Sequence, residues 1–306
     1  MERDAPPDRR RSRPPSPSTR AMIKRILVAL DPDADTRIAT HYAMDLARRT
    51  GAEITGLAVV DTKHIVAETG IGGSIGALHY AEKIRRQMTE KARDIAQDLI
   101  DTFVGTLDEA GLPHQELVMD GTPADLIVDA LNFHDILFVG RDPHFFYNRP
   151  DRPTDTLARV VKRGVAPAVV VGPAFRPIRR VLLACDGSAP SIQTMQRFAQ
   201  LQPFGTDLTV DLVHIREDTG EAARHRADLL LHRTRTYLEA HGFQTLNETS
   251  MEGDHTAERL LRHAEHHEAD LIVAGAHSVS AVRRIAFGST THALLDQSTI
   301  PLFLYH

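Results

Sequence analysis

The sequence predicts an α/β protein with two tandem domains, each a doubly wound, five-stranded parallel sheet. Short apolar runs bounded by breakers alternate with helical periodicities along the chain, which is typical of β-α-β units. Four segments of the first half recur in the same order in the second half. The 306 residues are also enough for two domains of ordinary size.

The recurring segments indicate that the chain contains two copies of one structural unit. Each half opens with an apolar run that ends in aspartate and closes with an apolar run after a proline. The pairs are Ile26–Asp31 with Val181–Asp186, Val118–Gly121 with Ser250–Gly253, Asp135–Gly140 with Asp270–Gly275, and Ala168–Val171 with Leu302–Tyr305. Duplication explains all of them. We expect a disordered basic tail over 1–22, one domain over 23–173, a linker at Pro173–Arg179 and a second domain over 178–306.

The first domain is expected to alternate strand and helix throughout. Gly51 ends its first helix, and an apolar stripe from Ile84 to Phe103 marks a long amphipathic helix. The expected order is strand Ile26–Leu30, helix Thr36–Arg49, strand Ile54–Val60, the long helix, strand Glu116–Met119, helix Pro123–Leu131, strand Ile136–Val139, helix Thr154–Lys162 and strand Ala168–Val171.

The second domain repeats this order. It is expected to run through Arg180–Ala184, Ser191–Leu201, Asp207–Ile215, Ala222–His241, Gln244–Ser250, His255–His267, Leu271–Ala274, Ser289–Gln297 and Leu302–Tyr305, beginning and ending with a strand. Parallel strands joined by helices imply right-handed crossovers.

An insertion distinguishes the two domains. The matched aspartates lie 155 positions apart and the matched glycines 132, so the first domain is longer by 23 residues between Asp31 and Gly121. The glycine-rich stretch Thr62–Tyr80 has no clean periodicity and is the candidate. We expect a loop there that could act as a lid.

Composition narrows the function classes. A formal charge of -5 argues against a general nucleic-acid binder, and the single cysteine, Cys185, excludes an internal disulfide framework. No apolar run approaches the roughly 20 residues needed to cross a bilayer. The arginine-rich start has no apolar run behind it, unlike a secretory signal. We expect a soluble, cytoplasmic protein without nucleic-acid or membrane partners.

The stretch Asp270–Ser289 carries the chemistry. An apolar strand ends at Gly275, and Gly288-Ser289-Thr290 precedes a helix that Ser289 or Thr290 could cap. Free N–H groups of that helix would face the carboxyl ends of the strands, where open α/β sheets bind ligands.

Asp186 after the first strand, together with Gly275, Ser278 and Gly288-Ser289 at spacings of two and nine residues, resembles the universal stress protein family. The two units resemble its tandem, E-like members, over essentially all of Ile23 to His306. The resemblance implies the adenine nucleotide alpha hydrolase-like fold and ATP, with or without Mg²⁺, as ligand. It also implies an internal pseudo-dimer in which Ala168–Val171 and Leu302–Tyr305 join the two sheets.

The resemblance assigns a binding role to seven residues of the second domain. Asp186 would lie at the adenosine end and Ile215 against adenine, and the remaining residues would line ribose and phosphates: Gly275, Ser278, Gly288, Ser289 and Thr290. Arg283 and Arg284 would neutralise phosphate charge or be solvated. The plainer alternatives are a helix N-cap for Asp186 and turn geometry for Gly275 and Gly288.

The first domain has lost most of this pattern. Gly140, Pro143, Pro153 and Thr154 occupy the corresponding positions, and proline offers no N–H to a phosphate. We therefore expect the second domain to be the better site.

No catalytic or metal-binding residue is assigned. His263 and His267 lie four apart on a predicted helix and could share a metal, but no third ligand stands in register, so a polar helix face is preferred. Asp211 lies in an apolar strand and has no assigned role. Cys185 is interpreted as core packing.

The leading hypothesis is a cytoplasmic universal stress protein that binds ATP in its second domain and acts as a ligand-gated stress-response regulator. At most it would be a slow ATPase, since no catalytic base is evident. The alternative is a nucleotide-independent interaction or scaffold protein that uses the glycine-rich insertion or the basic tail to recognise an unknown protein partner. Homodimerisation is left open.

Overall fold

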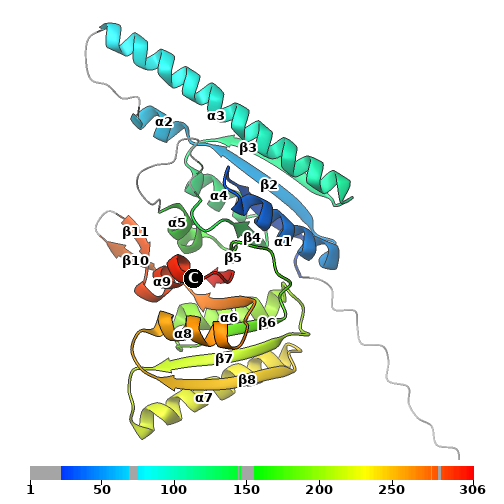
Figure 1. Cartoon of the computed structure of the whole chain (residues 1–306), viewed down its shortest axis with the longest axis vertical. Coiled ribbons are helices and arrows are strands. Elements are labelled where there is room, and N and C mark those ends of the chain that lie inside the picture. Colours follow the sequence, from blue (N-terminus) through cyan, green and yellow to red (C-terminus); the bar gives the residue numbers. More distant parts are fainter. Residues whose placement is uncertain (1–21, 69–74, 144, 146–154, 277, 282–283) are drawn as a thin grey trace, which may run out of the picture.

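The computed structural model describes residues 22–68, 75–143, 145, 155–276, 278–281 and 284–306 (Figure 1). The first unit contains β1 (Arg25–Leu30), α1 (Asp35–Thr50), β2 (Glu53–Val60), α2 (Thr62–Glu68), α3 (Ile75–Glu109), β3 (His114–Asp120), α4 (Pro123–Leu131), β4 (Ile136–Val139), α5 (Thr156–Arg163) and β5 (Ala168–Val170).

The second unit repeats this order and adds two short strands before its last helix. It contains β6 (Arg180–Ala184), α6 (Ala189–Leu201), β7 (Thr209–Arg216), α7 (Glu221–Ala240), β8 (Thr245–Glu252), α8 (Thr256–His266), β9 (Leu271–Gly275), β10 (Ser278–Ala281), β11 (Arg284–Phe287), α9 (Ser289–Gln297) and β12 (Leu302–Tyr305).

The ten main strands form one sheet in the order β3-β2-β1-β4-β5-β12-β9-β6-β7-β8. Within each unit the pairs are parallel, and β5 joins β12 antiparallel, with Val169 opposite Phe303. In Figure 1 the two halves of the sheet therefore meet at their terminal strands in the middle of the molecule. The predicted α/β fold and the predicted joining strands are confirmed.

Two apolar clusters cover the two faces of this sheet. One includes side chains of α1, α3, α6 and α7, and the other side chains of α4, α5, α8 and α9. Strand residues alternate between them: Val210 and Leu212 belong to the first cluster, and Val213 to the second. Each unit therefore buries both faces of its sheet, as expected for doubly wound parallel strands.

The prediction of a loop over Thr62–Tyr80 is wrong for its described part. α2 occupies Thr62–Glu68, and α3 already begins at Ile75. The Asp61 carboxylate accepts a hydrogen bond from the N–H of His64 at 2.9 Å, so it satisfies a free donor at the start of α2. Residues 69–74 lie outside the described residues, and with them three of the four glycines that suggested a lid, Gly70, Gly72 and Gly73; the fourth, Gly76, lies in α3.

The loop between β9 and α9 also contains structure that the sequence analysis missed. β10 and β11 pair antiparallel, with Val279 opposite Ala286. The hairpin projects from the carboxyl end of the sheet next to α9 (Figure 1). It places the start of α9 at the edge of the sheet where a ligand would bind.

Candidate functional site

A cavity of about 810 Å³ opens at the carboxyl ends of β6, β7 and β9. Six of the seven residues assigned to ligand binding line it: Asp186, Ile215, Gly275, Gly288, Ser289 and Thr290. Ser278 is the first residue of β10 and is not among the lining residues, and its side chain lies outside the described part of the structure. The fold therefore brings together six predicted residues from four separate segments of the second unit.

Asp186 is exposed at the mouth of this cavity. Its Oδ1 accepts a hydrogen bond from the N–H of Ser188 at 2.8 Å, which is an Asx turn. The N-cap of α6 is Ser188, whose side chain accepts from the N–H of Ser191, so the alternative of Asp186 as the N-cap is wrong. The second carboxylate oxygen of Asp186 accepts no hydrogen bond from the described residues, so it is available to a ligand.

The N-terminus of α9 forms another wall of the cavity. Gly288 is its N-cap residue, with no side-chain capping bond, and Ser289 is the first helical residue. The expectation that Ser289 or Thr290 caps the helix is therefore wrong, because the helix begins one residue earlier. The first-turn N–H groups keep their partial positive charge facing the cavity. Such a helix start is suited to an anion.

Gly275 has a packing role in addition to its place at the cavity. A Cβ atom there would approach the backbone nitrogen of Ser191 to 2.5 Å. The first unit has the same requirement, because a Cβ at Gly140 would meet the Cβ of Asp35 at 2.9 Å. The start of a helix thus packs directly on the end of a central strand in both units, and this explains the shared glycine without a ligand.

The β7 side of the cavity combines apolar and polar groups. Ile215 is half-buried and contacts the apolar cluster under α8 and α9. His214 places its Nδ1 at the carbonyl oxygen of Cys185. Cys185 is buried, and this burial raises the pKa of its thiol to about 12, which agrees with a packing role rather than a reactive thiol.

Arginines gather at one rim of the cavity. The buried Arg216 donates from Nε to Ser250 at 2.8 Å and from Nη2 to Glu252 at 2.9 Å, and Arg224 binds the same Glu252 carboxylate at 2.8 Å. The hydrogen bonds from Arg224 and Arg216 lower the pKa of the Glu252 carboxyl. Arg226 also lines the cavity, with its Nη2 3.8 Å from Asp218. Sequence reasoning missed these groups, although Arg216 directly follows the predicted Ile215.

The arginines proposed as phosphate partners remain untested. Arg283 lies outside the described residues, and Arg284 is described only as the first residue of β11. Whether either reaches the cavity is therefore a prediction of the sequence alone.

The corresponding place in the first unit is occupied by the protein's own chain. Asp31, the counterpart of Asp186, is buried, and its Oδ2 accepts a hydrogen bond from the N–H of Phe145 at 2.9 Å. Phe145 has a positive φ of 50° and is 1% exposed. Its ring belongs to the same apolar cluster as Val59, which the strand register matches to Ile215. Nothing in the sequence pattern marked Phe145.

A segment of the first unit also contacts the last helix of the second. Arg141 donates from Nη1 to the carbonyl oxygen of Leu295 in α9, and its N–H donates to Asp35 at 3.1 Å. Its guanidinium is half-buried, and that burial lowers its pKa. The helix whose N-terminus faces the cavity is thus tied at its other end to the first unit.

Comparison with known proteins agrees with the fold and the duplication. Along most of its length the chain is similar to the universal stress protein Slr1230 of Synechocystis, with 26% identity over 293 residues, which covers 92% of this chain and all of the relative. A universal stress protein from Archaeoglobus fulgidus aligns with a TM-score of 0.59 and 17% identity over 92% of this chain and 97% of that chain. A second solved structure, of a protein from Pseudomonas aeruginosa, aligns with a TM-score of 0.57 and 16% identity, over 93% of this chain and 94% of that chain. These structural likenesses concern the fold.

A family model describes both units separately. The model of the universal stress protein family matches residues 22–136 and again residues 177–306. These matches include β1 to β3 of the first unit and all of the second unit, with its cavity and its helix start at Gly288. The chain therefore belongs to the universal stress protein family, as a tandem member with two copies of the family's domain.

Proposed function

We propose that the second unit binds ATP in the cavity at the carboxyl ends of β6, β7 and β9. We further propose that the protein is a cytoplasmic stress-response regulator whose activity is switched by this binding. The observation that carries the proposal is the placing of an uncapped helix start and a carboxylate around one cavity of about 810 Å³. That volume falls in the range of about 300–1,000 Å³ found for small-molecule sites.

The phosphate end of the ligand is expected at α9. Ser289, Thr290 and Thr291 line the cavity and supply backbone N–H groups of the first helical turn and three hydroxyl groups. The helix start favours negative charge, and a glycine at the N-cap lets an anion approach the backbone closely. Any arginine contribution from Arg226 would add to this attraction.

The nucleoside end is expected between Asp186 and β7. A carboxylate is suited to accept hydrogen bonds from ribose hydroxyl groups, and the half-buried Ile215 offers an apolar surface to a base. These are the roles that the family resemblance assigns to both positions. We expect one nucleotide per chain, because in the first unit the carboxylate of Asp31, the counterpart of Asp186, already accepts a hydrogen bond from the N–H of Phe145.

The regulator part of the proposal is based on the contact between the units. A ligand bound at the start of α9 would change the free energy of that helix. Arg141 of the first unit contacts the other end of the helix, through its hydrogen bond to the carbonyl oxygen of Leu295. Coupling of this kind requires that the two arrangements of α9 bind the ligand with different affinity.

The test is calorimetric titration of nucleotide-free, full-length protein with ATP, with and without Mg²⁺. Gly288→Pro is the diagnostic variant. Gly288 has φ -61° and ψ 161°, angles that proline adopts, and it follows a strand residue, so the fold should tolerate the ring. The ring removes one N–H and fills space at the anion site. Gly288→Ala is the control, since it keeps the N–H.

About one equivalent of ATP bound by the wild type and by Gly288→Ala, with binding lost in Gly288→Pro, would support the proposal. No binding to folded wild-type protein would contradict it. That second result would favour a nucleotide-independent interaction protein, whose candidate recognition segments, the tail and the glycine-rich insertion, fall mostly outside the described residues.

A further inference from the structure

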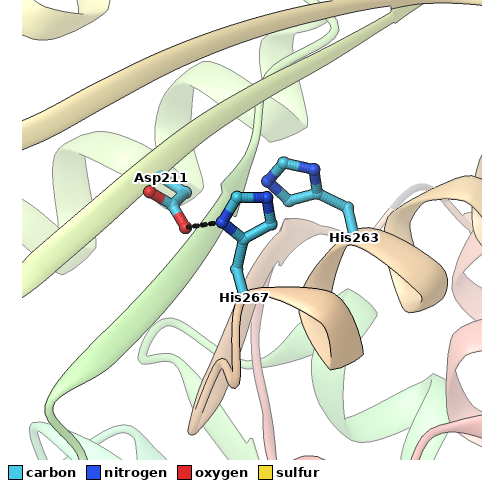
Figure 2. Close-up of side chains that lie close together, drawn as sticks. All are labelled: Asp211, His263 and His267. Atoms are coloured by element: carbon cyan, nitrogen blue, oxygen red, sulfur yellow. Dashed lines mark ion pairs between the residues drawn. The ribbon is translucent and has the colours of Figure 1, made fainter.

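Three potential metal ligands meet on the α8 face of the sheet, in its second half. Asp211 of β7, His263 of α8 and His267 at the end of α8 each place a side-chain ligand atom within 4.8 Å of the other two (Figure 2). Asp211 comes from β7, the strand next to the edge strand β8, and the histidines come from the helix packed over it. The sequence showed the histidine pair but could not show that a distant carboxylate completes the set.

Both histidines point in the same direction, toward β7 (Figure 2). They lie four residues apart, so they occupy the same helix face, and their rings stack with centroids 4.0 Å apart. His267 places Nδ1 at 3.9 Å from Asp211 Oδ2. A tetrahedral zinc site with bonds of about 2.0–2.1 Å needs ligand atoms about 3.3 Å apart, so this pair would have to approach by about 0.6 Å and the other pairs of the cluster by at most about 1.5 Å.

The carboxylate is held in place by a neighbouring strand. Asp211 is 7% exposed, and its Oδ1 accepts a hydrogen bond from Asn247 Nδ2 of β8 at 2.6 Å. The amide thus holds one carboxylate oxygen and leaves Oδ2 on the histidine side. Metal-binding carboxylates are commonly oriented by such an outer hydrogen bond.

One ligand atom lacks any other partner. His263 Nε2 is buried and has no hydrogen-bond partner among the described residues. A buried polar atom without a partner is destabilising and calls for an unseen partner such as water or an ion.

The first unit provides an internal comparison. Thr55 of β2 pairs with Leu27 of β1 as Asp211 pairs with Leu182 of β6, so Thr55 and Asp211 are equivalent positions. There a single buried histidine, His134, is fully satisfied. Its Nε2 lies 2.9 Å from Thr55 Oγ1 and its Nδ1 lies 2.7 Å from the carbonyl oxygen of Ala130. The second unit instead combines a carboxylate with a histidine that has an unsatisfied nitrogen.

The neighbouring charged and histidine side chains are not part of the three-residue cluster. Arg180 donates from Nη1 to the carbonyl oxygen of His267, and Glu268 neutralises it at 2.7 Å. His266 contacts His267 edge-to-face with centroids 5.1 Å apart but is not part of the three-residue cluster. The net charge of the proposed ligands, one carboxylate and two neutral imidazoles, is suited to a divalent cation.

We propose that Asp211, His263 and His267 form a binding site for a divalent transition metal, with Zn²⁺ as the expected occupant. Two histidines and one carboxylate with the remaining positions open to water are a ligand set used by zinc. The ion would join α8 to β7, and through Asn247 to β8. Asp211 and Ile215 are four residues apart on β7, or about 13 Å at roughly 3.3 Å per residue, so the ion would lie away from the nucleotide cavity.

The test uses untagged, full-length protein stripped with a chelator and titrated with Zn²⁺ by calorimetry. Co²⁺ titration followed by visible absorption reports the coordination geometry independently. The variants are Asp211→Asn, His263→Gln and His267→Gln. His266→Gln is the matched control, because it removes an exposed histidine from the same helix end. Circular dichroism checks the fold of each protein.

We expect one equivalent of Zn²⁺ in the wild type and in His266→Gln, and at least a 100-fold loss of affinity in each of the three variants. Asn247→Ala should lower the affinity by about 10- to 100-fold, as outer-shell changes commonly do. If Asp211→Asn or His263→Gln fails to fold, His267→Gln still decides the matter, since that side chain is 45% exposed. No stoichiometric binding to wild type, or equal binding by folded His267→Gln, would overturn the proposal.

Discussion

The backbone N–H of Phe145 donates a hydrogen bond to Oδ2 of Asp31 at 2.9 Å, at the position where the second unit has the exposed Asp186. Two copies of one fold thus treat the same aspartate in opposite ways. In the first copy the carboxylate is buried and accepts a hydrogen bond from Phe145, whose ring is part of the apolar core. In the second copy the carboxylate lines an open cavity.

The first prediction concerns the packing of Phe145. Replacing it with alanine leaves a cavity in the apolar cluster, so the free energy of unfolding of the first unit should fall by about 3–5 kcal/mol. Phe133→Ala is the control, because its ring is 70% exposed and should change stability by no more than about 0.5 kcal/mol. Urea denaturation of both variants measures the difference. Equal stability would show that the ring does not support the core.

The sequence predicted the architecture well because the signal was local. Apolar runs such as Ile136–Val139 and Leu302–Tyr305 have the bounds that were expected, since both are short buried strands after clear breakers. The family resemblance then identified the strands that join the two halves of the sheet. Six predicted site residues meet at one cavity because their segments all end at the same edge of a parallel sheet.

What could not be predicted depends on contacts between distant segments. Phe145 fills its position only because the loop after β4 returns to Asp31, and no periodicity records such a return. Asp211 gains its histidine neighbours only when α8 crosses β7. The start of α9 after Gly288 and the helical start of the insertion at Thr62 are boundary effects, and the second involves a single side-chain hydrogen bond, from the N–H of His64 to Asp61.

The second prediction compares the two equivalent aspartates. Asp186→Ala should weaken ATP binding about 10- to 100-fold, because a hydrogen bond to a charged group contributes about 1.5–3 kcal/mol. Asp31→Asn should leave ATP affinity unchanged, since the side chain at that position already accepts a hydrogen bond from the N–H of Phe145. Calorimetry on both variants decides the point. An equal loss in both would mean that the first unit also takes part in binding.

The third prediction separates packing from ligand contact at Gly275. Gly275→Ala places a methyl group 2.5 Å from the backbone nitrogen of Ser191, so the unfolding free energy should fall by about 1–3 kcal/mol even without nucleotide. Gly105→Ala is the matched control, because it is exposed within α3 and has no atom within 4 Å of the new Cβ. That change should stabilise the protein by about 0.5–1 kcal/mol. Thermal unfolding compares the two, and a neutral Gly275→Ala would contradict the packing explanation.

The last prediction concerns pH and His134. Burial lowers the pKa of this histidine below its usual value near 6.5, so its ring stays neutral in the folded protein at a pH where the unfolded chain already binds a proton. More protons are then bound by the unfolded state, and stability rises with pH in this window. The neutral ring therefore contributes its full stabilisation above pH 6.5 and loses it as the pH falls below that value. Wild-type protein should unfold at a lower temperature at pH 5.5 than at pH 7.5.

The His134→Gln variant isolates this contribution. Glutamine can still bond Thr55 but cannot take up a proton, so the melting temperature should depend less steeply on pH than in the wild type. His266→Gln is the control, because that histidine is exposed and should leave the slope unchanged. An unchanged slope in His134→Gln would mean that other histidines, among them the half-buried His263 with its lowered pKa, govern the acid sensitivity.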